Sequence, residues 1–256
     1  MNFYVIELLL LLSVVAGGAV VSYLNATNKN QYIKLALAFS GGFLLAVIFQ
    51  HLLPELYGAH QHHGHPDHAQ QTLPVFQVGL FILLGFLVQL VLEYFSGGIE
   101  HGHVHVHKEQ AMPWALFVSL SVHSVIEGIP LGNMLQIGIE NAVVPYNASF
   151  FWGIVFHQVP VAIALMTLLF ATRLKRREAW LILLAFGLMT PLGVFIGLGV
   201  TTEHLGLNVN VILAVVVGMF LHISTTIIFE TTENHKFNLM KLVSILVGVT
   251  LALGLF

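Results

Sequence analysis

Eight long apolar stretches, spread over all 256 residues, constrain this sequence more than any other feature. A helix needs about 20 apolar residues to cross a bilayer. The stretches cover about 4–24, 35–57, 73–95, 112–134, 149–172, 179–200, 207–229 and 239–256. They leave no room for a soluble domain. The sequence therefore predicts one transmembrane domain over 1–256, an all-α bundle of eight helices.

The composition agrees with an integral membrane protein and excludes other classes. Charged residues make up 8% of the chain, whereas soluble domains carry about 25%. With 9 basic residues, nucleic-acid binding finds no support. The absence of cysteine excludes disulfides, thiolate metal sites and cysteine nucleophiles. The first stretch carries Glu7, lacks a basic start and stays apolar to Leu24, so we expect a retained span and not a signal peptide.

The basic residues predict the orientation in the membrane. All 9 fall in alternate loops: before the second span, after the third, between the fifth and sixth, and between the seventh and eighth. Loops rich in Lys and Arg stay on the cytoplasmic side. Both termini are therefore expected outside, with an even number of spans.

The fourth span carries the strongest polar motif. His123 and Glu127 are four residues apart, so both point from one helix face. Charged side chains at membrane depth cost several kcal/mol unless they are paired, hydrated or bound to something. Pro130 follows and removes a backbone donor. We expect it to break the helix and free carbonyls toward an aqueous cavity.

The fifth span contributes a second polar motif at nearly the same depth. His157 and Gln158 precede Pro160 there. Two imidazoles and one carboxylate at one level suit a borderline divalent cation such as zinc. The alternative is a His–Glu pair that only holds two helices together. In the sixth span, Thr190 and Pro191 predict another kink.

Two further pairs lie toward the membrane surfaces. His51 and Glu55 belong to an outer approach or are interfacial residues that reach water. His222 and Glu230, with hydroxyl residues between them, belong to an inner exit path or to helix packing. Either interpretation is compatible with the sequence.

Histidine-rich loops are predicted at 58–72 outside and 96–111 inside. Neutral imidazoles on a flexible chain bind zinc and its neighbours weakly, which favours metal capture or sensing over a plain polar linker. The histidines are His60, His62, His63, His65 and His68 in the first loop and His101, His103, His105 and His107 in the second.

Four motifs, taken in this order, make the chain resemble the ZIP family of divalent metal transporters over nearly its whole length. They are Gly42 through Glu55, His123-Ser124-x-x-Glu127-Gly128, His157-x-x-Pro160, and Leu188 through Gly193. The resemblance implies a bundle with inverted repeats and a metal site between spans four and five. It also implies alternating access by an elevator-like motion that carries metal into the cytosol.

Carried over residue by residue, the resemblance makes His123, Glu127 and His157 the ligands of the main site. Ser124 and Gln158 occupy positions that help to hold a second metal in many members. The fuller family pattern in span five is His-Glu-x-Pro-His-Glu, whereas this chain has Gln158 and Val161 at two of those positions. We therefore expect one metal ion with water completing its shell.

The predicted function is import of a divalent metal, zinc first, with iron, manganese, cobalt or cadmium as further substrates. Neither a cofactor nor catalytic residues are expected, and the partners are the metal ion, the bilayer and a second copy of the chain in a homodimer. The chain is expected to be a multi-pass protein of the plasma membrane, specifically of a bacterial inner membrane. The alternatives are an intramembrane zinc hydrolase with Glu127 as base and, less favoured, a haem carrier with His123 and His157 as axial ligands.

Overall fold

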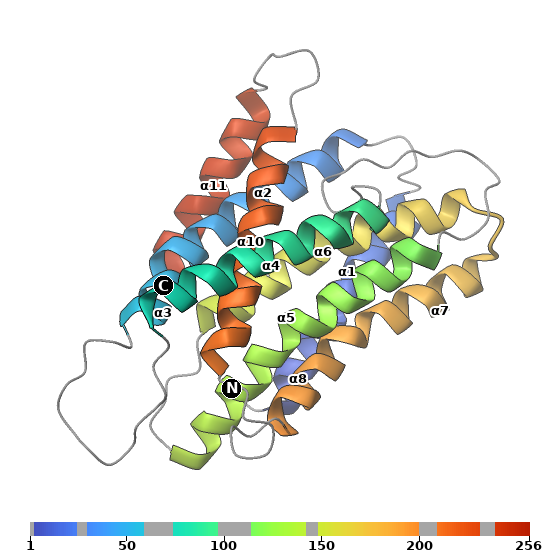
Figure 1. The fold of residues 1–256 in the computed structure, drawn as a ribbon. Coiled ribbons are helices and arrows are strands. Elements are labelled where there is room, and N and C mark those ends of the chain that lie inside the picture. The colour runs from blue at the N-terminus through green and yellow to red at the C-terminus, as the bar shows by residue number, and fades with distance from the viewer. Residues whose placement is uncertain are drawn as a thin grey trace.

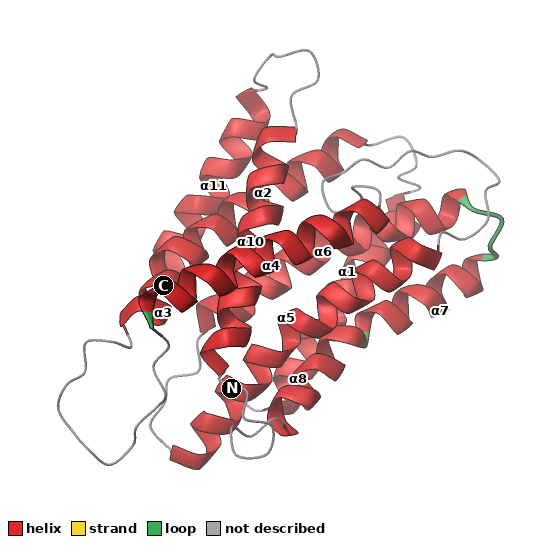
Figure 2. Cartoon of the chain, in the orientation of Figure 1, coloured by secondary structure: helices red, strands yellow, loops and turns green. Residues whose placement is uncertain are grey.

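The computed structural model describes residues 3–24, 30–58, 74–96, 114–141, 148–199, 209–230 and 239–256. Every regular element within these ranges is a helix, as the sequence predicts (Figure 2). The elements are α1 (Phe3–Leu24), α2 (Asn30–Val47), η1 (Ile48–Leu52), α3 (Leu53–Gly58), α4 (Val75–Ser96), α5 (Trp114–Asn141), α6 (Ala148–Ala171), α7 (Arg176–Gly187), α8 (Met189–Gly199), α10 (Val209–Glu230) and α11 (Leu239–Leu255).

Seven candidate membrane spans lie within the described residues. Two are composite: Lys34–Gly58 joins α2, η1 and α3, and Arg176–Gly199 joins α7 and α8. The eighth apolar helix, α11, has 17 residues, so its crossing remains a prediction. The start of α1 and the end of α11 lie at the same end of the bundle, as an even number of crossings requires (Figure 1).

The expected break at Pro130 is wrong. Helix α5 continues through that proline for 28 residues, and α6 continues through Pro160. Each proline leaves one carbonyl of the preceding turn without its usual donor, but packing on neighbouring helices holds the helix together. Near Pro191, where a kink is predicted, the helix is interrupted at Leu188, between α7 and α8. Pro191 then lies in the first turn of α8, where a missing N–H costs little.

Close packing divides the helices into two groups. The first bundle contains α1, α5, α6, α7 and α8, with α5 packed along α8 and α1 along α6. The second bundle contains α2, α4, α10 and α11, with α2 packed along α11 and α4 along α10 (Figure 1). The bundles meet mainly where α2 lies on α6 and α4 lies on α5.

Glycines bring α5 and α8 into backbone contact. A Cβ added at Gly132 would lie 2.0 Å from the carbonyl oxygen of Val194, and one added at Gly193 would lie 2.2 Å from that of Val125. No larger residue fits at this separation without moving a backbone. Small residues of this kind allow transmembrane helices to approach closely. The contact brings the start of α8 against the middle of α5.

Two hydrophobic clusters lie one after the other along the bundle, and polar residues fall between them. On α5, Leu120 belongs to one cluster and Leu131 to the other. The interval between these two leucines holds His123 and Glu127. The same change of cluster occurs around Ser13 on α1, His157 on α6 and His222 on α10. A buried polar layer thus separates two apolar layers.

Candidate metal site

Three ligand-type side chains converge in the polar layer of the first bundle. His123 and Glu127 lie one turn apart on α5, and His157 faces them from α6. One donor atom from each lies within 4.8 Å of the others, and the residues are 3%, 1% and 1% exposed. Among the described residues, no other group of three or more such ligands meets this criterion. The spacing of four residues on α5 therefore places His123 and Glu127 on one helix face, as the sequence predicted.

The geometry aims two imidazoles and one carboxylate at a common point. The Nε2 atom of His123 lies 3.3 Å from Oε2 of Glu127. The ring centroids of His123 and His157 are 5.9 Å apart, with the rings nearly perpendicular at 77°. Phe220 of α10 packs beside both rings, at 6.5 and 6.2 Å between centroids. A carboxylate buried among apolar groups requires a cation or strong hydrogen bonds.

Glu127 is anchored by one oxygen, which leaves the other toward His123. Its Oε1 atom accepts hydrogen bonds from Gln158 Nε2 and Thr190 Oγ1, both at 3.1 Å. Gln158 also contacts Thr190, and its own oxygen accepts a hydrogen bond of 2.9 Å from Ser13. Helices α1, α6 and α8 thus hold one carboxylate of α5. The amide of Gln158 presents its nitrogen, not its oxygen, to Glu127.

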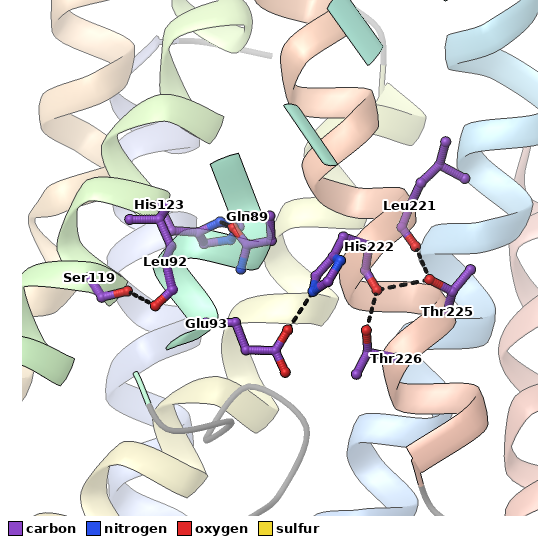
Figure 3. Close-up of polar contacts among 9 residues, drawn as sticks. All are labelled: Gln89, Leu92, Glu93, Ser119, His123, Leu221, His222, Thr225 and Thr226. Atoms are coloured by element: carbon purple, nitrogen blue, oxygen red, sulfur yellow. Dashed lines mark hydrogen bonds and ion pairs between the residues drawn. The ribbon is translucent and has the colours of Figure 1, made fainter. Parts of the chain in front are cut away.

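A hydrogen bond links this group to the second bundle. Gln89 of α4 is fully buried, and its Oε1 atom lies 2.9 Å from Nδ1 of His123 (Figure 3). With the proton on Nδ1, His123 donates it to Gln89 and keeps the Nε2 lone pair for a metal ion. This arrangement fixes the tautomer and the orientation of the ring.

Gln89, Ser13 and the hydroxyl of Thr190 belong to this site but were not predicted from the sequence. A signal was present for the first of them. Gln89 and Glu93 are polar residues four apart within the mostly apolar α4. Such a spacing places both side chains on one helix face, as it does for His123 and Glu127.

The remaining predicted residues lie outside the three-ligand group. Ser124 is buried, one position beyond His123. His51 lies in the π-helical turn η1 with its ring edge-on to Phe256 at 5.8 Å, and Glu55 is exposed on α3. On α10, His222 pairs with Glu93, and Glu230 ends the helix. The histidine-rich loops fall in 59–73 and 97–113, outside the described residues.

A family model described as ZIP Zinc transporter matches residues 2–112 and 98–255, which together cover nearly the whole chain. The chain belongs to the ZIP zinc transporter family. With its apolar helices, membership makes it a multi-pass integral membrane protein. Neither the family nor the relatives support the alternative of an intramembrane hydrolase.

Two curated relatives illustrate the range of similarity within the ZIP family. Zinc transporter ZIP3 of Homo sapiens is 26% identical over 280 residues, which covers 90% of this chain and 87% of the relative. Zinc transporter SLC39A7 of Mus musculus is 33% identical over 88 residues, which covers 32% of this chain. The match spans only 18% of the length of that relative. A bacterial origin, a homodimer and the outside position of the termini remain predictions.

Proposed function

We propose that this ZIP family member imports a divalent metal ion, zinc first, and that His123, Glu127 and His157 bind it in transit. The convergence of these three buried side chains within 4.8 Å carries the proposal. Two imidazole nitrogens and a carboxylate oxygen match the donors that zinc prefers. Iron, manganese, cobalt and cadmium use overlapping donor sets, so they are the further candidate substrates.

The same residues favour a single ion with a partly aqueous shell. Val161 offers no donor, and the Gln158 amide is engaged with Glu127 and Ser13. Ser124, buried beside His123, is an additional oxygen within the same stretch of α5. Water would complete the coordination. Fewer anionic ligands mean weaker binding, and a transporter must release its ion as well as bind it.

We infer that the ion crosses by alternating access, with the site near the membrane midplane. All three ligands belong to the first bundle, and Gln89 of the second bundle lies within hydrogen-bond distance of His123. A sliding motion between the bundles would carry the site without dismantling it. The position of the polar layer between the two hydrophobic clusters supports a site deep in the membrane. His51 and Glu55 would then serve the outer approach, and His222 and Glu230 the inner release.

Zinc uptake into vesicles that enclose a fluorescent zinc indicator tests the proposal. We expect Glu127→Gln and His157→Ala to reduce the initial rate at least tenfold, because each removes a donor from the ion. Thr250→Val is the matched control, since its hydroxyl only bonds the α11 backbone at Leu246 and Val247. Uptake that survived in both site variants, with the proteins folded and inserted, would contradict the proposed site.

A further inference from the structure

We propose that Glu93 of α4 and His222 of α10 form a second binding station for the divalent ion, located in the second bundle. The proposal rests on the transport function proposed above. The two side chains form an ion pair through Glu93 Oε2 and His222 Nε2 (Figure 3). Their exposed fractions are 16% and 6%, so both donors are largely removed from solvent. They supply one carboxylate and one imidazole, the same donor types as the first site.

The backbone around the pair holds it in place. A Cβ added at Gly85 of α4 would lie 1.9 Å from the carbonyl oxygen of Val215, and one added at Gly218 of α10 would lie 1.9 Å from that of Ile82. These glycines bring α4 and α10 into backbone contact about one turn from His222. The ring of Phe86 then packs edge-on against His222 at 4.6 Å between centroids.

Two of the hydroxyls beside His222, those of Thr225 and Thr226, are hydrogen-bonded to the backbone. Thr225 and Thr226 donate hydrogen bonds of 3.0 and 2.8 Å to the carbonyl oxygen of His222 (Figure 3). This back-bonding is common for hydroxyl residues in transmembrane helices. It explains the hydroxyls without assigning them to the ion. Glu93 is the carboxylate that faces the imidazole.

Helix α4 connects the two sites. Gln89 and Glu93 lie one turn apart on one face of α4, which is about 6 Å along its axis. Gln89 contacts His123 of the first site, and Glu93 contacts His222. Ser119 of α5 donates a hydrogen bond of 2.5 Å to the carbonyl oxygen of Leu92, which fixes α5 against α4 at this level.

The order of the two sites along α4 gives the second one a role in release. Glu93 lies nearer Ser96, where α4 ends and the basic loop predicted to be cytoplasmic begins. An ion that leaves His123, Glu127 and His157 toward the cytoplasm would meet Glu93 and His222 next. Two protein donors hold a divalent ion less tightly than three. The ion would therefore pass from stronger to weaker binding on its way out.

A helix-bridging ion pair without metal is the competing explanation, and zinc stoichiometry separates the two. The background is the full chain with the histidines of the 59–73 and 97–113 loops replaced by Asn, purified in detergent and equilibrated with saturating zinc. Adding Glu127→Gln and His157→Ala should remove one bound ion and leave another. Adding Glu93→Gln to that variant should remove the remaining ion. Glu178→Gln, an exposed carboxylate that caps α7, is the control and should remove none.

The outcomes separate this proposal from the transport proposal. If the variant that carries Glu127→Gln and His157→Ala still binds one zinc ion after Glu93→Gln and His222→Ala are added to it, while its melting temperature falls, the pair is structural and the second station is overturned. Glu93→Asp is the control for misfolding, because it keeps the carboxylate at this position. This variant should retain the ion. If both ions bind but vesicles take up no zinc or other divalent metal, the transport proposal fails and the second station stands.

Discussion

At the scale of single residues, the hydrogen bonds to Glu127 determine how it can bind an ion. One oxygen is held by Gln158 and Thr190, and the other lies beside His123. Hydrogen bonds to a charged group are stronger than those between neutral groups. They keep the carboxylate in one orientation, so little reorganisation is needed when an ion enters. Residues that orient ligands in this way influence affinity nearly as much as the ligands do.

Replacing Gln158 should therefore weaken metal binding without removing a ligand. We expect Gln158→Leu to lower zinc affinity about 10- to 100-fold, the range typical for loss of an orienting partner. Competition with a zinc indicator in detergent measures it. Thr167→Val on the same helix should bind zinc normally, because its hydroxyl bonds only the carbonyl of Ile163. Equal affinity in both variants would show that Gln158 does not orient the carboxylate.

Part of the site could be predicted from the sequence at this scale. The four-residue spacing of His123 and Glu127 and the depth of His157 brought the three side chains to attention, and the structure places them together. Their role as metal ligands stays a prediction. Gln89 and Ser13 escaped because nothing in a single sequence shows which helix lies beside which. A polar residue in an apolar helix indicates that a polar partner lies nearby, but it does not show which residue that partner is.

At the scale of elements, the α5–α8 contact sets the position of Thr190 against Glu127. Glycines on both helices make the contact, so α5 could continue past Pro130 with its neighbour holding it. The sequence predicted a break there because a proline inside a helix usually kinks or ends it. The packing of α8 against α5 is a tertiary contact, and the sequence alone does not show it. The interruption at Leu188, by contrast, could be predicted from the neighbouring Pro191.

Two glycine substitutions should affect stability in opposite directions. Gly132→Ala places a Cβ 2.0 Å from a backbone oxygen of α8, so we expect a loss of about 1–3 kcal/mol and weaker zinc binding as Thr190 moves. Gly254→Ala on α11 meets no atom within 4 Å. It should be neutral or stabilising by up to about 1 kcal/mol, since alanine favours helix. Thermal unfolding in detergent measures both, and equal melting temperatures would contradict the contact.

At the scale of the whole molecule, the chain is two packed groups of helices. The apolar stretches predicted the helices. The orientation expected from the basic loops stays a prediction. The division into two bundles could not be predicted from the sequence, because it depends on which apolar faces and which glycines of different helices meet. Local periodicity carries no information about that choice.

The orientation can be tested with single cysteines, since the natural chain has none. An impermeant maleimide added outside intact cells should label Tyr57→Cys. This residue lies at the end of α3 that is predicted to face outside, and both Tyr57 and the neighbouring Gly58 are exposed. It should not label Glu178→Cys beside the basic loop before α7 until the membrane is opened. Labelling in the reverse pattern would contradict the predicted topology, and with it the outer and inner roles proposed for the polar pairs.

Acid should inhibit uptake by the whole protein. A metal-binding imidazole must be neutral, and free histidine titrates near pH 6.5. Lowering the pH from about 7.5 to about 5 should therefore decrease zinc uptake, with protons competing at His123 and His157. Initial rates in vesicles with matched internal pH measure this. A flat profile would argue against histidine ligation.

The polar layer enclosed between two hydrophobic clusters has a consequence for the cell that carries this protein. In the described conformation, apolar side chains lie on both sides of the layer along α1, α5, α6 and α10. We expect such packing to block a continuous file of water along these described helices, so the resting protein should conduct no current. Each ion would have to wait for a rearrangement of helices. Uptake should then saturate at modest rates, and the membrane potential would survive even abundant expression.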